Sequence, residues 1–247
     1  MFISLGKWTP DLLDKIISES NKLKDQGKRI ESISQNFFET PYKNNTLKGW
    51  IDKKEQLTLS LDGVDCFTFI DYVEAMRLSD SYISFLTNLQ RIRYKNSTIE
   101  FTARNHFFTD WIESNSDFVE DVTGNIGGEK ARTKEKILNL KGDGSYFLPG
   151  IGTVKRRIVY IPSQYIDIEI TEQLKTGDYA GIYTETPGLD VSHVGIIIRA
   201  SNQTLLRHAS SKKDYKKVID EDFMEYIKNK DGLIVLRPKD NPNILDK

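Results

Sequence analysis

The chain contains 247 residues, of which 38% are hydrophobic and 29% are charged, and its net charge is -1 at pH 7. This length suits one large domain or two small ones, and it can bury a core without disulfides or a structural metal. The near-zero net charge argues against a nucleic-acid partner, and no apolar run approaches the ~20 residues that span a bilayer.

The first predicted elements are helices. Thr9-Pro10-Asp11 has the residue types that begin a helix, and apolar residues then recur at helical spacing up to Gly27, which is predicted to end it. A second short helix is predicted around Ile30, Ile33 and Phe37, ending before Pro41. Residues 1–35 carry no chemical motif and are predicted to be an N-terminal helical extension.

A loop over 40–45 and a short strand containing Leu57, Leu59 and Leu61 are predicted next, followed by a turn at Asp62-Gly63. A helix is predicted to begin at Cys66, with one apolar stripe and with Asp71, Glu74 and Arg77 on the other side. Further helical segments are expected over 82–92 and 106–112. Trp111 is expected in the core.

Residues 114–150 are rich in glycine and are predicted to form an extended loop. An irregular stretch of this length within a compact domain is often functional, so it is a candidate binding insertion.

The second half of the chain is predicted to be rich in strands. The predicted strands cover 157–161, 179–183, 194–198, 204–208 and 233–236, with a hairpin turn at Ser201-Asn202-Gln203. Helices that precede an antiparallel sheet indicate the α+β class. We expect a single domain over 1–247, with the early helices packed against or around the sheet.

Cys66 is the only cysteine, and it stands where the helix after Asp62-Gly63-Val64-Asp65 is predicted to begin. A thiol at a helix N-terminus faces the positive end of the helix dipole, which favours the reactive thiolate. The backbone N–H groups at the same helix end can stabilise an oxyanion. The alternative is a buried structural cysteine.

The chain has three histidines, at positions 106, 193 and 208. His193 and His208 flank the predicted hairpin turn, where neighbouring strands can bring them together, and a base oriented by a second polar group fits the logic of a catalytic triad. A structural polar cluster or a zinc site are the alternatives. Neither a His-x-x-x-His spacing nor a cysteine pair is present, so no metal and no other cofactor is expected.

Four motifs together resemble the NlpC/P60 peptidases, which have a papain-like core. Gly63-Val64-Asp65-Cys66 resembles the nucleophile motif, and Leu174–Tyr179 resembles the turn into the core sheet. Ser192-His193-Val194-Gly195-Ile196 resembles the strand that bears the base, and Leu206–Ser210 resembles the strand that bears the third catalytic residue. The resemblance implies that Cys66 attacks an amide carbonyl, that His193 transfers the proton, and that His208 orients His193.

Further residues resemble the DUF1460 branch of that superfamily, from about residue 36 to residue 238. These are Thr40-Pro41-Tyr42 with Thr46-Leu47, Phe67 after the nucleophile, and Arg104-Asn105-His106-Phe107-Phe108 with Trp111. The branch is similar to N-acetylmuramoyl-L-alanine amidases acting on peptidoglycan fragments, notably those with 1,6-anhydromuramic acid. Phe67 departs from the serine of the wider superfamily, so the usual γ-D-glutamyl–diaminopimelate specificity is not assumed.

The resemblance also assigns roles around the nucleophile. Tyr42 and Asp65 are expected to line the active site, with Tyr42 donating to the oxyanion, although a packed loop tyrosine is the alternative. Substrate contacts are expected from Arg104, Asn105, His106 and Ser192, because aromatic rings and polar groups side by side suit a sugar. Alternatively, Asn105 caps the short helix that follows it.

Three rival functions remain open at this point: a γ-D-glutamyl endopeptidase acting within the stem peptide, a catalytically silent cell-wall-binding module, and an acyltransferase that uses the same thiol. The expected partner is a muropeptide, with no nucleic acid and no membrane span, and the protein is expected to be a monomer. The N-terminus does not resemble a signal peptide. The substrate favours the cell envelope, periplasm or secretion, with a signal absent from this sequence, and the cytoplasm is the alternative.

Overall fold

The computed structural model describes residues 1–201 and 203–240, which divide into two compact units. The first unit comprises Met1–Arg104 and Arg207–Asp220, and the second comprises Asn105–Leu206 and the residues from Glu221 onward. Helices and strands are both abundant, which confirms the α+β class. The assignment of 1–247 to a single domain stays a prediction.

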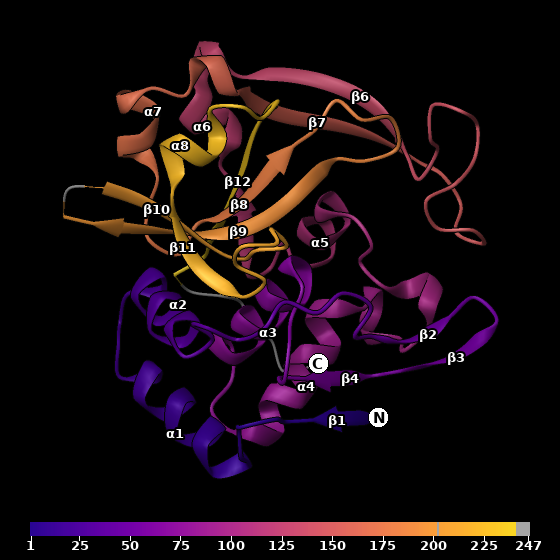
Figure 1. Ribbon diagram of the computed structural model, residues 1–247, viewed down its shortest axis with the longest axis vertical. Helices are drawn as coiled ribbons and strands as arrows, with labels where there is room; N and C mark the ends of the chain where they lie inside the picture. Colours follow the sequence, from indigo (N-terminus) through magenta and orange to yellow (C-terminus); the bar gives the residue numbers. More distant parts are fainter. Residues whose placement is uncertain (202, 241–247) are drawn as a thin grey trace. The chain divides into compact units, whose positions relative to one another are not determined.

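Four α-helices and four short strands make up most of the first unit (Figure 1). In chain order they are β1 (Phe2–Ser4), α1 (Pro10–Asn21), α2 (Gln26–Gln35), β2 (Lys48–Trp50), β3 (Lys53–Gln56), β4 (Thr58–Ser60), α3 (Cys66–Arg77) and α4 (Tyr82–Arg93), followed by 3-10 turns at Lys95–Ser97 and Phe101–Ala103. β1 pairs in parallel with β4, and β2 pairs with β3.

The boundary predicted at Gly27 was wrong. Helix α1 ends at Asn21, and Gly27 is the second residue of α2. The reason is Asp25, whose carboxylate accepts a hydrogen bond from the Lys28 N–H at 2.7 Å and thereby caps a new helix. Thr9 caps α1 as predicted, accepting from the Leu12 N–H.

Helix α3 is buried on nearly every side and is the centre of the first unit. The helices α1, α2 and α4 all contact it. The polar side of α3 was predicted to lie opposite the core, but it is buried as well. Glu74 and Arg77 form a fully buried ion pair at 2.6 Å. Asp71 pairs with Arg93 of α4 at 2.8 Å. Buried charges are tolerated when they are paired in this way. Through the Asp71–Arg93 pair, the polar side of α3 is bonded to α4.

A twisted sheet is the framework of the second unit (Figure 1). Its strand order is β11-β10-β9-β8-β12-β7-β6, with β5 also paired to β12. The strands are β5 (Val119–Asp121), β6 (Arg132–Leu138), β7 (Val154–Pro162), β8 (Tyr179–Tyr183), β9 (Val191–Ala200), β10 (Gln203–Ala209), β11 (Val218–Asp222) and β12 (Gly232–Pro238). The chain passes from one unit to the other within β10 and again within β11.

Short helices cover both faces of this sheet within the second unit. They are α5 (Phe108–Ser114), α6 (Thr123–Gly127), α7 (Ile168–Gln173) and α8 (Phe223–Ile227), with 3-10 turns at Gly128–Lys130 and Ser163–Tyr165. Apolar residues of α6, α7 and α8 join one core cluster with Ile182 of β8 and Ile197 of β9 (Figure 1). Helix α5 packs on the opposite face, where Trp111 contacts Tyr179 with ring centroids 5.3 Å apart. The prediction that Trp111 is in the core is confirmed.

The prediction of an extended loop over 114–150 was wrong for most of its length. Residues 119–138 form β5, α6, a 3-10 turn and β6, and β6 pairs with β7 over seven residue pairs, from Arg132↔Tyr160 to Leu138↔Val154. The irregular parts are the turn 115–118 and the longer segment 139–153. The strands predicted in the second half are confirmed, whereas Asn202 of the predicted hairpin turn lies outside the described residues.

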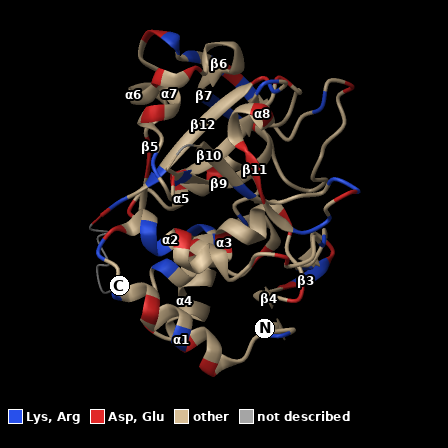
Figure 2. Cartoon of the chain, turned by 60° about the vertical axis from the view of Figure 1, so that its left-hand side comes forward, with Lys and Arg blue, Asp and Glu red and all other residues tan. Residues whose placement is uncertain are grey.

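Acidic and basic residues are both scattered over the chain in Figure 2, in keeping with the small net charge. Within the described part of the chain, no helix is both long enough and apolar enough to cross a membrane.

Candidate active site

Cys66 is the first residue of α3 and is half-buried. The preceding Asp65 caps the helix, because its carboxylate accepts from the N–H of Phe67 at 3.1 Å and of Thr68 at 2.7 Å. The Thr68 hydroxyl accepts in return from the Asp65 N–H at 3.0 Å, which completes a capping box. This reciprocal pair fixes the helix start, and with it the position of the thiol at the positive end of the dipole.

Tyr42 lies beside this helix start within the first unit. Its segment forms a parallel bridge with Val64, with hydrogen bonds from Val64 N–H to Pro41 O at 3.0 Å and from Lys43 N–H to Val64 O at 2.9 Å. Burial raises the pKa of the Tyr42 hydroxyl above its ordinary value of 10.0, and negative charge on Cys66 and Asp65 raises it further. The Tyr42 hydroxyl is therefore a neutral O–H group near the thiol. Its role in lining the active site stays a prediction.

His208 also belongs to the first unit and is almost completely buried, at 1% exposure. The neighbouring Arg207 fixes this end of β10, because its guanidinium pairs with both carboxylate oxygens of Asp220 at 2.8 Å. The same guanidinium donates to the Ser34 hydroxyl of α2 at 3.1 Å. The pairing of Arg207 with Asp220 was not predicted from the sequence, because the Leu206–Ser210 motif contains Arg207 but gives no sign of its partner.

His193 belongs to the second unit, where it is the third residue of β9 and pairs with Ile182 of β8. Paired residues share one face of an antiparallel sheet, so His193 lies on the face covered by α8. Its ring centroid is 6.1 Å from that of Tyr226 on this helix. His193 is half-buried.

The register between β8 and β9 shifts directly before His193, because Tyr183 pairs with Val191 while Ile182 pairs with His193. Ser192 is the extra residue; it is exposed, and its hydroxyl donates to the Ile182 carbonyl at 3.3 Å. Bulges of this kind turn a side chain toward a new direction and are frequent beside active sites.

A buried carboxylate holds the start of β9 in place. Asp190 is 2% exposed and accepts from the Thr109 N–H at 2.7 Å, the Thr109 hydroxyl at 2.9 Å and the Val191 N–H at 2.8 Å. Burial raises the pKa of Asp190 despite these three donors. The sequence reasoning missed this residue; the only available signal was an acidic residue between a turn and a β-branched run.

The structure places the predicted substrate-contact residues 104–106 in different surroundings. Arg104 is in the first unit, where its guanidinium pairs with both oxygens of Glu55 at 2.7 Å, and Glu55 also accepts from the Tyr94 hydroxyl at 2.6 Å. Arg104 is therefore held by a buried structural ion pair. Its contact with substrate stays a prediction, as does that of Ser192.

Asn105 and His106 belong to the second unit. The alternative reading of Asn105 as a helix cap was wrong, because α5 begins at Phe108 and its N-cap residue is Phe107. The Asn105 side chain instead accepts from the Ser114 hydroxyl at 2.7 Å, at the other end of α5. His106 is half-buried.

Metal chemistry was the alternative for the histidines. In residues 1–201 and 203–240, no group of three or more His, Cys, Asp and Glu side chains is arranged to hold a metal ion.

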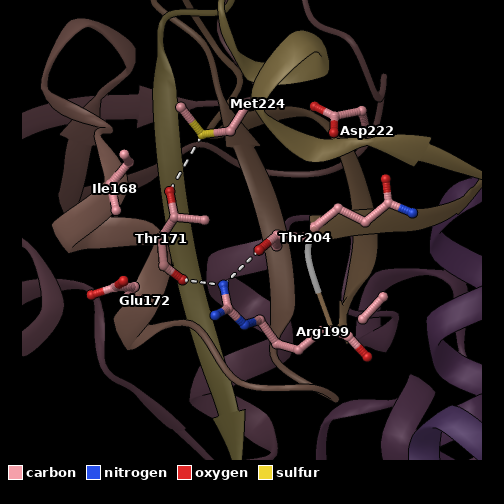
Figure 3. Close-up of a pocket in the computed structure, with 10 residues that line it drawn as sticks. Ile168, Thr171, Glu172, Arg199, Thr204, Asp222 and Met224 are labelled. Carbon is pink, nitrogen blue, oxygen red and sulfur yellow. Dashed lines mark hydrogen bonds between the residues drawn. The ribbon is translucent and has the colours of Figure 1, made fainter.

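A surface hollow of about 340 Å³ lies elsewhere on the second unit (Figure 3). It is formed by α7, the start of α8 and the end of the β9–β10 hairpin, with Arg199 donating to the Thr171 carbonyl and the Thr204 hydroxyl. Arg199 is six residues from His193 along an extended strand, or roughly 20 Å. The hollow is therefore separate from the candidate site.

Comparisons with known proteins agree with the sequence motifs. The model of the AmiA-like family, described as N-acetylmuramoyl-L-alanine amidase-like, matches residues 32–233. A search of curated proteins found no match.

Several solved structures are similar to this chain. The crystal structure of an N-acetylmuramoyl-L-alanine amidase from Bacteroides uniformis is 31% identical, with a TM-score of 0.73, and the match covers 87% of this chain and 99% of that one. A Bacteroides fragilis protein named as a xylanase candidate is 31% identical, with a TM-score of 0.69. The match covers 83% of this chain and 99% of that one.

A DUF1460 protein from Legionella pneumophila has the same fold, with 23% identity, a TM-score of 0.77 and coverage of 93% and 94%. Because the family model spans more than half of the sequence, this chain belongs to the AmiA-like family of N-acetylmuramoyl-L-alanine amidase-like proteins.

Proposed function

We propose that the protein is a cysteine amidase that hydrolyses the amide between N-acetylmuramic acid, in its 1,6-anhydro form, and the L-alanine of peptidoglycan fragments. The observation that carries the proposal is the single cysteine at the capped start of α3, beside the neutral hydroxyl of Tyr42, in a chain of the AmiA-like family. The muramoyl-alanine amide comes from the name of the family and of the Bacteroides uniformis relative. A papain-like core of the NlpC/P60 type is part of the proposal.

In the first half of the proposed reaction, the Cys66 thiolate attacks the lactyl carbonyl carbon of the muramic acid. The resulting oxyanion accepts hydrogen bonds from the backbone N–H of Cys66 and the hydroxyl of Tyr42. His193, protonated when the thiol ionises, gives its proton to the L-alanine nitrogen as the C–N bond breaks. The products of this half are a free stem peptide and a thioester on Cys66.

In the second half, a water molecule loses a proton to His193 and attacks the thioester carbonyl. The C–S bond breaks, the muramic acid leaves with a carboxylate, and the thiolate of Cys66 is restored. His208 orients His193 through its second ring nitrogen.

Product analysis tests the proposal. Purified anhydromuropeptides are incubated with wild-type protein and with Cys66→Ala, and the products are identified by mass spectrometry. The expected products are the disaccharide and an intact stem peptide beginning with free L-alanine, absent with the variant. Cleavage between D-glutamate and diaminopimelate would contradict the amidase and favour an endopeptidase, and no product from any fragment would favour a binding module.

The monomeric state remains a prediction. So does the location in the cell envelope or outside the cell, with the cytoplasm as its alternative.

A further inference from the structure

The irregular segment 139–153 of the second unit is held in shape by one buried side chain. Asn139 is fully buried, and its amide nitrogen donates to the carbonyls of Leu148 at 3.1 Å and Ile151 at 2.8 Å. Its amide oxygen accepts from the Leu148 N–H at 2.8 Å, and its carbonyl accepts from the Phe147 N–H at 3.1 Å. A loop that closes on a satisfied buried amide is ordered before any ligand arrives.

This loop is joined to the turn between β8 and β9. The Asn139 N–H donates to the Gly188 carbonyl at 2.8 Å. Gly188 has a φ of +86°, and a Cβ there would lie 2.6 Å from the Leu140 carbonyl oxygen and 2.9 Å from the Phe147 ring, so only glycine permits this approach. Lys136 fastens the same turn, because its buried ammonium donates to the carbonyls of Thr184 at 2.5 Å and Thr186 at 2.8 Å.

The joined turn leads directly to the candidate base. His193 is five positions after Gly188, a span of at most about 17 Å even if the chain is fully extended. The loop over 139–153 is therefore at the same end of the sheet as His193, within one unit and independent of how the two units are placed.

The tip of the loop presents an aromatic ring to solvent. Leu140 and Tyr146 form an antiparallel bridge, closed by the hydrogen bond from Lys141 N–H to Ser145 O at 2.8 Å and by a turn in which Gly144 has a φ of +84°. Tyr146 is 46% exposed although its backbone is fixed. The Asp143 carboxylate and the Ser145 hydroxyl lie in the same turn, joined at 2.7 Å.

We infer that loop 139–153 binds the glycan part of the substrate, with the Tyr146 ring stacking on a pyranose face. A sugar ring packs its apolar C–H surface against an aromatic face, while adjacent polar groups bind the sugar hydroxyls. A rigid aromatic residue loses little conformational entropy on binding, which distinguishes it from a flexible surface side chain. The choice of a sugar as the ligand rests on the proposed amidase function.

The test is a binding measurement that needs no turnover. The peptide-free disaccharide of N-acetylglucosamine and 1,6-anhydro-N-acetylmuramic acid is titrated calorimetrically into full-length Cys66→Ala protein. Adding Tyr146→Ala is expected to weaken disaccharide binding about tenfold, because one aromatic stacking contact is lost. Tyr146→Phe keeps the ring, so its dissociation constant should stay within about twofold of the value for Cys66→Ala alone. Ile168→Ala is the control: this residue is 74% exposed beside the separate hollow of the second unit, and its loss should leave the affinity unchanged.

The inference would be overturned if the Cys66→Ala protein and the Cys66→Ala/Tyr146→Ala protein bound the disaccharide with equal affinity. It would also be overturned if the Cys66→Ala protein did not bind the disaccharide. The proposed function is measured separately, by wild-type turnover of anhydromuropeptides. Turnover together with Tyr146-independent binding would refute the glycan loop alone. Tyr146-dependent binding without turnover would support the loop and refute the amidase.

Discussion

At the scale of single residues, Cys66 is the side chain on which the proposed chemistry depends. Cys66→Ser is expected to lower kcat by about 10³-fold or more, because a serine hydroxyl ionises far less readily than a thiol. The substitution is nearly isosteric at a half-buried position, so the free energy of unfolding should change by less than about 1 kcal/mol. Muropeptide turnover and thermal unfolding measure the two effects, and wild-type turnover in the variant would rule out the mechanism.

Tyr42 supports a prediction about pH. Its pKa is raised, by burial first and by the charges of Cys66 and Asp65 second, so its hydroxyl keeps the proton at every pH below its ordinary value of 10.0. Tyr42→Phe removes an oxyanion donor and should lower kcat about 10²-fold with little change in KM. The alkaline limb of the rate profile should stay at the same pH in this variant. If that limb moves, Tyr42 itself titrates in the working range.

Some residue roles could be read from the sequence and others could not. Asp65 caps the helix that begins at Cys66, and a local pattern reveals such neighbours because they lie in one turn. Tyr42 was expected near Cys66 only from the family resemblance. The pairing of Arg104 with Glu55 joins residues 49 positions apart, and Asp190 with Thr109 joins residues 81 apart. Contacts over such distances depend on the tertiary fold, which periodicity and spacing do not encode.

At the scale of elements, the packing of α5 on β8 depends on a missing side chain. A Cβ on Gly181 would lie 2.5 Å from the ring of Phe108, which is fully buried. Gly181→Ala should therefore lower the free energy of unfolding by about 1–3 kcal/mol. Gly124→Ala in α6 is the control, since its nearest neighbour would be 3.9 Å away; it should be neutral or stabilising by up to about 1 kcal/mol. Equal effects in denaturant titrations would contradict this packing.

Helices and strands with a strong hydrophobic pattern were predicted correctly, whereas those with a weak pattern were not. Strands β8, β9 and β12 have β-branched or aromatic runs, and α4 has a clear helical period, so their existence was predicted correctly. Strand β6 has the sequence Arg132-Thr133-Lys134-Glu135-Lys136-Ile137-Leu138 and lies at the edge of the sheet, where charged residues are normal and alternation is lost. The polar side of α3 was misread because Asp71 pairs with Arg93 of α4 and Arg77 donates to Gln26 of α2. Partners on other helices are not visible in the periodicity of α3 itself.

At the scale of the whole molecule, the proposed mechanism uses a thiol nucleophile and a histidine base. Metal plays no part in this mechanism, so incubation with EDTA followed by gel filtration should leave muropeptide turnover within about 10% of its starting value. Loss of activity that zinc restores would replace the thiol mechanism with a metal-dependent one.

The most direct test of the central claim is the mass of the covalent intermediate. The protein is mixed with an anhydromuropeptide, quenched in acid within a turnover and digested, and the peptide containing Cys66 is weighed. The thioester mechanism predicts an adduct equal to the disaccharide acyl group, with no amino acid attached. An adduct that retains L-alanine and D-glutamate would contradict the proposed amidase.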